Sequence, residues 1–175
     1  IGEDGSVYFD ILSFEDYGKL ANINLKKDQK DKLRGLQDEY NSNSPQDFAL
    51  WKARKANDGE VFWDSPWGQG RPGWHIECSA MSTKILGNHF DIHCGGVDNI
   101  FPHHENELAQ SVGSNGEKFV NYWVHSEHLM IDGEKMSKSK MNFFTLKDLK
   151  EKGFSPQSIR YQLLSGHYRT KISFS

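Results

Sequence analysis

One stretch, residues 91–110, restricts the fold of this chain more than any other. It begins within a short apolar run of β-forming residues, 89–93, which is too short for a helix and predicts a strand. Gly95 and Gly96 then break the run, and Pro102 fits the first turn of a helix, where its missing N–H is not needed. Strand, glycine turn and helix form the unit that places ligands at the carboxyl end of a sheet strand. The stretch therefore predicts an α/β fold with a ligand site at that end.

The flanking sequence predicts how this unit continues. Residues 119–125 form a second strand, and a helix between two strands makes a βαβ crossover, so the two strands should be parallel. A helix is predicted over 74–86, and another over 49–55 with Asp47 as its cap. In the last part of the chain, Asp132-Gly133 predicts a turn, and Thr145 and Ser155 predict the starts of two helices, the second with proline at its first position. Residues 26–39 are dominated by charge, which favours a solvated helix or a flexible loop. The residues expected to be buried on the helix at 74–86 are Ile76, Ala80, Ile85 and Leu86.

Composition excludes several classes of protein. Lysine and arginine number 21 against 24 aspartates and glutamates, a net charge of −3, so any nucleic-acid contact must come from local patches. No apolar run approaches the roughly 20 residues that span a bilayer, so we expect no membrane anchor. Two cysteines, Cys78 and Cys94, argue against a disulfide framework and favour a reducing compartment, so we expect a cytoplasmic protein. We also expect it to be a monomer. The chain begins without Met, and both ends read as cuts through a larger protein.

Three residues with metal-ligand chemistry form the first candidate site. His103 and Glu107 are four residues apart and project from one helix face, and Cys78 lies in the first half of another predicted helix. Zinc accepts sulfur, imidazole nitrogen and carboxylate oxygen, and catalytic zinc sites keep one position open. His104 is the rival ligand, but its neighbour four residues on is Leu108, which cannot coordinate. The alternative is a buried cysteine and a surface His–Glu pair without metal.

Two further groups suggest a nucleotide. Gly95 and Gly96 let a ligand approach the backbone, and the Asp98 carboxylate just beyond can accept hydrogen bonds from ribose hydroxyls; the alternative is a simple tight turn. Residues 135–140 carry three lysines and two serines, which suit a mobile phosphate clamp. On composition alone, the default interpretation of that stretch is a solvated basic loop.

Particular strings in the sequence resemble one family. KMSKS at Lys135–Ser139 resembles the second signature of class I aminoacyl-tRNA synthetases. GRPGWHIECSAM at Gly70–Met81 and FPHHENELAQ at Phe101–Gln110 are similar to the cysteinyl-tRNA synthetases in particular. YFD near the start, DFALWK at Asp47–Lys52 and LLSGHYR at Leu163–Arg169 agree, so the resemblance covers nearly the whole chain.

The resemblance implies a fold and its division along the chain. It implies the second half of a Rossmann-like nucleotide-binding fold with a connective insertion. Residues 1–70 would be the insertion region, 71–144 the second half of the catalytic domain with the KMSKS loop, and 145–175 a helical segment leading to the stem-contact and anticodon-binding region. The other class I signature, HIGH, is absent from the sequence, as is a cysteine that supplies the family's fourth zinc ligand.

The resemblance also implies an activity and roles for individual residues. L-cysteine and ATP, with Mg²⁺, would give cysteinyl-adenylate, and the cysteinyl group would pass to tRNA(Cys). One zinc per subunit would be held by Cys78, His103 and Glu107. The substrate amino acid would meet Trp74 and His93, with a helix-start core position and a purely structural histidine as the respective alternatives. ATP would contact Gly95, Gly96, Asp98 and Lys138, and Lys135 with Lys138 would be catalytic through their charge.

Two departures and two alternatives stay open. Cys94 stands where the family usually has glycine, and we expect it to be a bystander. Lys140-Met141-Asn142 follows KMSKS where Leu-Gly-Asn is more usual, so the loop hinge could differ. A related ligase that joins cysteine to an amino-sugar in thiol biosynthesis shares the zinc, KMSKS and much of GRPGWHIEC. A non-catalytic zinc-binding fragment is the alternative from a different class, because HIGH is missing.

Overall fold

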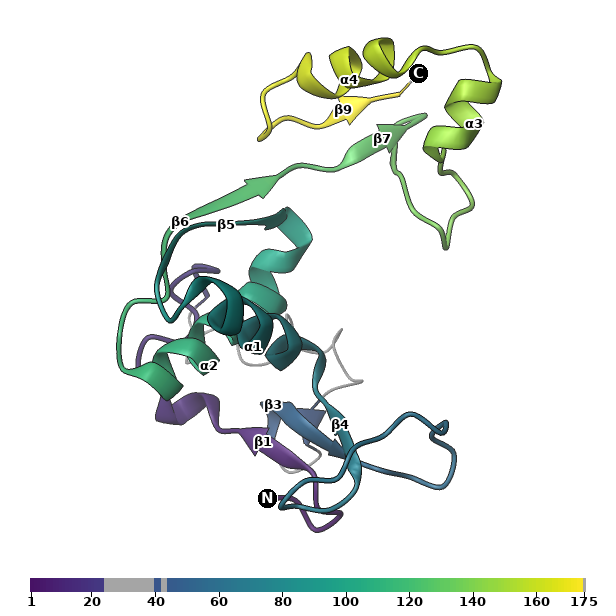
Figure 1. Ribbon diagram of the computed structural model, residues 1–175. Helices are drawn as coiled ribbons and strands as arrows, with labels where there is room; N and C mark the ends of the chain where they lie inside the picture. Colours follow the sequence, from purple (N-terminus) through teal and green to yellow (C-terminus); the bar gives the residue numbers. More distant parts are fainter. Residues whose placement is uncertain (24–39, 42–43, 175) are drawn as a thin grey trace. The chain divides into compact units, whose positions relative to one another are not determined.

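The structure is a computed structural model that describes residues 1–23, 40–41 and 44–174 (Figure 1). It divides into two compact units, residues 1–92 with 99–122 and residues 93–98 with 123–175. The loop or helix predicted over 26–39 lies outside the described residues. Within the described ranges, no helix has the length and apolar character needed to cross a membrane.

The first unit contains an antiparallel sheet built around one long strand. Strand β3 (Ser44–Ala53) pairs with β1 (Val7–Phe9), β2 (Tyr40–Asn41) and β4 (Gly70–Pro72). The helix predicted over 49–55 is therefore wrong, because β3 runs to Ala53. The Asp47 carboxylate does not cap a helix and instead accepts a 3.3 Å hydrogen bond from the backbone N–H of Ile11. Pairing with neighbouring strands outweighs the local helix signal here.

Two helices of the first unit lie side by side (Figure 1). Helix α1 (Trp74–Leu86) has the bounds that the sequence predicts, and α2 (Glu105–Asn115) follows a short helical turn, Ile100–His104, that contains Pro102. The side chains that α1 buries are polar, His75 and Ser79. The burial predicted for the apolar side of α1 is wrong at three positions: Ile76 is half-buried, but Ala80, Ile85 (78% exposed) and Leu86 (57% exposed) are not buried.

The core of the first unit fixes the start of α2. Phe48 stacks on Phe9 with ring centroids 5.1 Å apart, and Ile11, Tyr17 and Ala109 join the same cluster. The polar contacts of Glu105 and Asn106 add to this packing. The fully buried Glu105 carboxylate accepts backbone N–H groups of Gly18 and Ala21, both at 2.8 Å, and the Tyr17 hydroxyl donates to Asn106. The helix that carries Glu107 is thus held at its first turn by buried polar contacts as well as by packing.

Strands β5 (Phe90–Gly96) and β6 (Val120–Ser126) pair with each other. Residues later in β5 contact residues that are also later in or beside β6. The N–H of Phe90 donates to the carbonyl of Phe119 at 3.1 Å, the His93 ring stacks on Trp123, and the Ser126 hydroxyl meets the carbonyl of Gly95. Contacts that ascend in the same order mean parallel strands, as the βαβ crossover predicts.

The second unit completes the chain with a small sheet and two capped helices. Strand β7 (Leu129–Ile131) pairs antiparallel with β8 (Glu134–Lys135) and parallel with β9 (Ile172–Ser173). The predicted Asp132-Gly133 turn has both residues in the left-handed region, at φ 50° and 79°. Thr145 caps α3 (Leu146–Glu151), and Ser155 caps α4 (Pro156–Leu164), which confirms both predicted helix starts.

Candidate active-site groups

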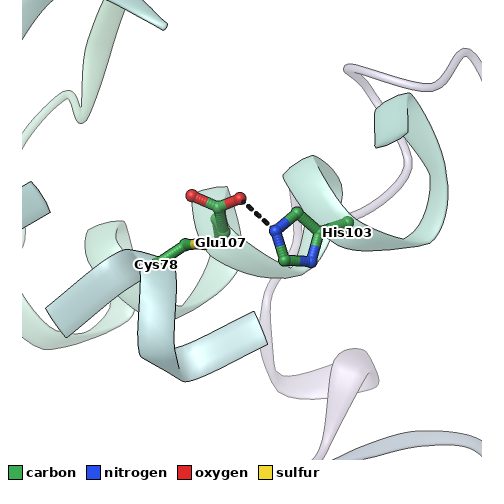
Figure 2. Close-up of side chains that lie close together, drawn as sticks. All are labelled: Cys78, His103 and Glu107. Atoms are coloured by element: carbon green, nitrogen blue, oxygen red, sulfur yellow. Dashed lines mark ion pairs between the residues drawn. The ribbon is translucent and has the colours of Figure 1, made fainter. Parts of the chain in front are cut away.

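Cys78, His103 and Glu107, together called the metal set, meet between the two helices of the first unit. Cys78 projects from α1, Glu107 from α2, and His103 from the helical turn before α2 (Figure 2). One ligand atom from each residue lies within 4.8 Å of the others, and Nε2 of His103 is 3.0 Å from Oε1 of Glu107. Residues distant in the sequence are thus brought to a group that could hold a metal ion.

Burial of the metal set favours a bound cation. Glu107 has no exposed surface, and a carboxylate removed from water needs positive charge or donors beside it. Burial raises the pKa of the Cys78 thiol, and the negative charges of Glu107 and then Glu77 raise it further. In the metal-free protein the thiol is therefore held in its protonated form. A cation between these groups would offset the carboxylate charge and favour the thiolate.

Aromatic rings surround His103. The Trp74 ring centroid lies 4.5 Å from that of His103, and Trp74 is 52% exposed, so it is not a core residue at the helix start. On α1 next to it, His75 places its Nδ1 2.8 Å from Nδ1 of His103. Sequence reasoning missed His75. The available signal was its spacing, since it lies three residues before Cys78, about one turn away on the same helix.

In the second unit, Asp98 and Lys135 contact each other directly. Nζ of Lys135 lies 2.9 Å from Oδ2 of Asp98, and this hydrogen bond is the main reason that the pKa of the Asp98 carboxyl is below its usual value. Gly96 lies beside them, and a Cβ at Gly96 would collide with Oδ1 of Asp98. The absence of a side chain at position 96 is therefore what leaves room for the carboxylate, and Gly95 precedes it at the end of β5.

The KMSKS loop is braced by a single amide side chain. Asn142 accepts the backbone N–H of Ser137 at 2.9 Å and donates to the carbonyl of Lys135 at 3.1 Å. Met141, at the departure from Leu-Gly-Asn, has a φ of 53°, which is the left-handed region that favours glycine. The side chain of Lys138 is exposed. The hinge thus keeps a glycine-type conformation without a glycine.

His93 and Cys94 lie at the carboxyl half of β5. His93 is half-buried and stacks on Trp123 with centroids 4.7 Å apart, and Trp123 stacks in turn on His125. Burial lowers the pKa of His125, and the charge of His93 lowers it further. Cys94 is exposed, and both cysteines are free thiols.

The comparisons with known proteins agree with this chemistry. Residues 1–175 match the family described as the catalytic domain of class I (C) tRNA synthetases. The chain belongs to this family. The mixed α/β fold with parallel and antiparallel strands is consistent with such a domain, and the predicted fold class is confirmed.

Several curated relatives are named cysteine–tRNA ligases. The chain is 62% identical to the protein from Brachyspira hyodysenteriae over 98% of its length, 56% identical to that from Chlamydia muridarum over all of it, and 57% identical to that from Opitutus terrae over 98%. It covers only 36–38% of each of these relatives. The chain thus spans a little over a third of the length of the synthetases that it matches.

Proposed function

We propose that this synthetase chain supplies the second half of the catalytic domain of a cysteine–tRNA ligase. Its family, and relatives named for that activity over its whole length, support the assignment. The division into an insertion region at 1–70, a catalytic half at 71–144 and a helical segment at 145–175 is part of the proposal. So are its partners, L-cysteine, ATP with Mg²⁺ and tRNA(Cys), and its action as a cytoplasmic monomer.

The proposal rests on the metal set, and the metal that we propose for it is zinc. Tetrahedral zinc with bonds of about 2.0–2.3 Å keeps its ligand atoms about 3.3–3.6 Å apart. The 3.0 Å between His103 and Glu107, and the 4.8 Å limit on all three ligand atoms, need only small shifts to reach that geometry. One sulfur, one nitrogen and one oxygen also suit zinc better than magnesium or calcium, which prefer oxygen alone.

Such a site would allow cysteine to be distinguished from serine. Cysteine and serine differ by one atom, and a hydrophobic pocket separates near-isosteres by only about 10–200-fold. When bound, zinc supplies an open position that favours a soft thiolate over a hydroxyl. Beside the metal set, Trp74 has its ring half-exposed at 4.5 Å from His103, where it can pack on a small substrate side chain. We propose His93 as a second contact for the amino acid.

The second unit supplies the groups for ATP. Gly95 and Gly96 leave the backbone open, and Asp98 carries a carboxylate for the ribose hydroxyls. Lys135 and Lys138 bring positive charge to the phosphates as the carboxylate of the amino acid attacks, and that nucleophile is already ionised. Because Lys135 binds Asp98 at 2.9 Å, ATP must compete with this contact when its ribose enters.

Zinc binding tests whether the metal set is the zinc site. The second cysteine, Cys94, lies outside the set and serves as an internal control. One equivalent of zinc should protect Cys78 from alkylation and leave the exposed Cys94 reactive. Cys78→Ser and His103→Ala should each lower metal content and cysteine affinity together. Stoichiometric zinc in both variants, or equal protection of both thiols, would refute the metal set as the site.

Exchange of pyrophosphate with ATP tests the activity. The 175 residues alone should give no cysteine-dependent exchange, because the resemblance assigns essential groups to the absent HIGH segment. A chain extended to the length of the relatives should give robust exchange and should charge tRNA(Cys). Transfer of cysteine to an amino-sugar in place of tRNA would support the thiol-biosynthesis alternative, and exchange from the 175 residues alone would exclude a non-catalytic fragment.

A further inference from the structure

A buried histidine outside the metal set touches the imidazole of His103. His75 lies on the side of α1 that faces α2, with 2% of its surface exposed, and its Nδ1 is 2.8 Å from Nδ1 of His103. The Phe48 ring meets His75 edge-on at 5.8 Å, and the Trp74 ring lies 5.3 Å away. The His75 side chain is therefore confined by packing with one nitrogen directed at its neighbour.

Two imidazole nitrogens at this distance must share one proton. A pair of lone pairs or a pair of N–H groups at 2.8 Å would repel, so one Nδ1 donates and the other accepts. Which ring donates depends on the other nitrogen of His103. Its Nε2 faces Oε1 of Glu107 at 3.0 Å, on the side of the metal set.

Coordination of a metal through Nε2 decides the direction of this hydrogen bond. A neutral imidazole carries one proton, so a lone pair on Nε2 requires the proton of His103 to be on Nδ1. We propose that His75 is a positioning residue of the metal centre: its Nδ1 accepts the Nδ1–H of His103, which fixes the tautomer and the ring orientation that present Nε2 to the metal. This inference rests on the metal site of the proposed function.

Ligating histidines generally donate their second N–H to a carboxylate, a carbonyl or water, and loss of that acceptor typically lowers metal affinity 10–100-fold. Here the acceptor is another imidazole, and it comes from α1, the helix that also carries Cys78. The same helix thus supplies one ligand and orients another. If His75 only fills space against Phe48, an apolar side chain of similar size would serve as well.

Two substitutions separate these roles. His75→Leu removes the acceptor and keeps an apolar branched side chain, whereas His75→Asn places an amide oxygen close to the position of Nδ1. Zinc affinity of the full chain, measured by chelator competition, should fall 10–100-fold in His75→Leu and recover substantially in His75→Asn. Ser79→Ala is the control for general disturbance of the α1–α2 contact, since Ser79 is buried there and bonds Gln110, and its zinc affinity should match the wild type.

Nitrogen NMR of the histidine side chains provides a readout that a space-filling role would not move. In the zinc-loaded wild type, His103 should carry its proton on Nδ1, and Nδ1 of His75 should show the shift of an acceptor. Wild-type zinc affinity in a folded His75→Leu, or a zinc-loaded His103 protonated on Nε2, would overturn the inference while leaving the metal set intact. Absence of zinc binding in the wild type would instead overturn the proposed metal site together with this inference.

Discussion

Nε2 of His103 lies 3.0 Å from Oε1 of Glu107, one helical turn further along the chain, and the Glu107 carboxylate has no exposed surface. The spacing of four residues places the two side chains on one face, and packing of α1 against α2 brings Cys78 to the same point. Local helix geometry thus brings His103 and Glu107 together, and tertiary packing adds Cys78 to them.

Removing the Glu107 charge should lower the pKa of the Cys78 thiol in the metal-free protein. Burial is the larger cause of the raised pKa, so in Glu107→Gln it should fall only part of the way to the ordinary value. The rate of iodoacetamide alkylation against pH measures this, in a Cys94→Ser background that leaves one thiol. Glu77→Gln is the matched control and should cause a smaller decrease. An unchanged profile in Glu107→Gln would show that its charge does not act on the thiol.

Loss of Lys135 should raise the pKa of Asp98. The hydrogen bond from Lys135 is the largest cause of the lowered value, so Lys135→Met should move the carboxyl back toward its usual range. A carbon-detected NMR titration of the Asp98 carboxyl measures the change. Lys140→Met removes a neighbouring lysine that pairs with Glu134 at 3.0 Å, and it should leave Asp98 unaffected. Equal shifts in both variants would mean that Lys135 acts only through general charge.

A side chain at Gly96 should displace the Asp98 carboxylate. The added Cβ would collide with Oδ1 of Asp98, so Gly96→Ala should weaken the contact with Lys135 and raise the pKa of Asp98. The same NMR titration reads this effect. Gly59→Ala adds a Cβ where nothing lies within 4 Å and should change nothing. An Asp98 pKa in Gly96→Ala equal to the wild-type value would contradict the close approach.

Replacing Glu105 should destabilise the fold. Its two oxygens accept the N–H groups of Gly18 and Ala21, and Gln would present an NH₂ group to one of them. An unsatisfied buried donor costs about 1–3 kcal/mol, so urea unfolding of Glu105→Gln should show a loss of that size. The exposed Glu151→Gln is the control. Equal free energies of unfolding for Glu105→Gln and the wild type would show that the carboxylate does not hold the 17–21 segment.

Glu105 should also make the free energy of unfolding depend on pH. Burial raises the pKa of Glu105 against the lowering effect of the backbone donors, so the folded state keeps its proton at a pH where the unfolded state has lost it. Stability from this group therefore falls as pH rises from the ordinary glutamate pKa toward the raised folded value. In urea unfolding at a series of pH values, this decrease in stability should be absent in Glu105→Gln and retained in Glu151→Gln.

The sequence predicted the local elements well where one residue has a clear chemical role. Thr145 and Ser155 cap their helices, and Asp132-Gly133 forms the turn, because these residues act on backbone groups within a few positions. The helix expected over 49–55 failed because β3 is stabilised by strands on both sides, which no local pattern in Phe48 to Ala53 encodes.

Burial on α1 could not be predicted from hydrophobicity. The sequence favoured Ile85 and Leu86, yet the buried side carries His75 and Ser79, because their polar groups find partners on His103 and Gln110. The closeness of His103 and Glu107 was predictable from their four-residue spacing, whereas Cys78 was joined to them by its ligand chemistry and by the resemblance to the synthetase family. The contact of His75 was not, since it depends on how two helices meet.

X-ray absorption at the zinc edge, on the zinc-loaded chain with Cys94→Ser, tests the central claim most directly. With zinc held by Cys78, His103 and Glu107, the spectrum should report one sulfur and additional nitrogen or oxygen ligands. Addition of L-cysteine should bring a second sulfur at about 2.3 Å, and L-serine should not change the sulfur count. A sulfur count that L-cysteine leaves unchanged, or a spectrum without sulfur before its addition, would contradict the account.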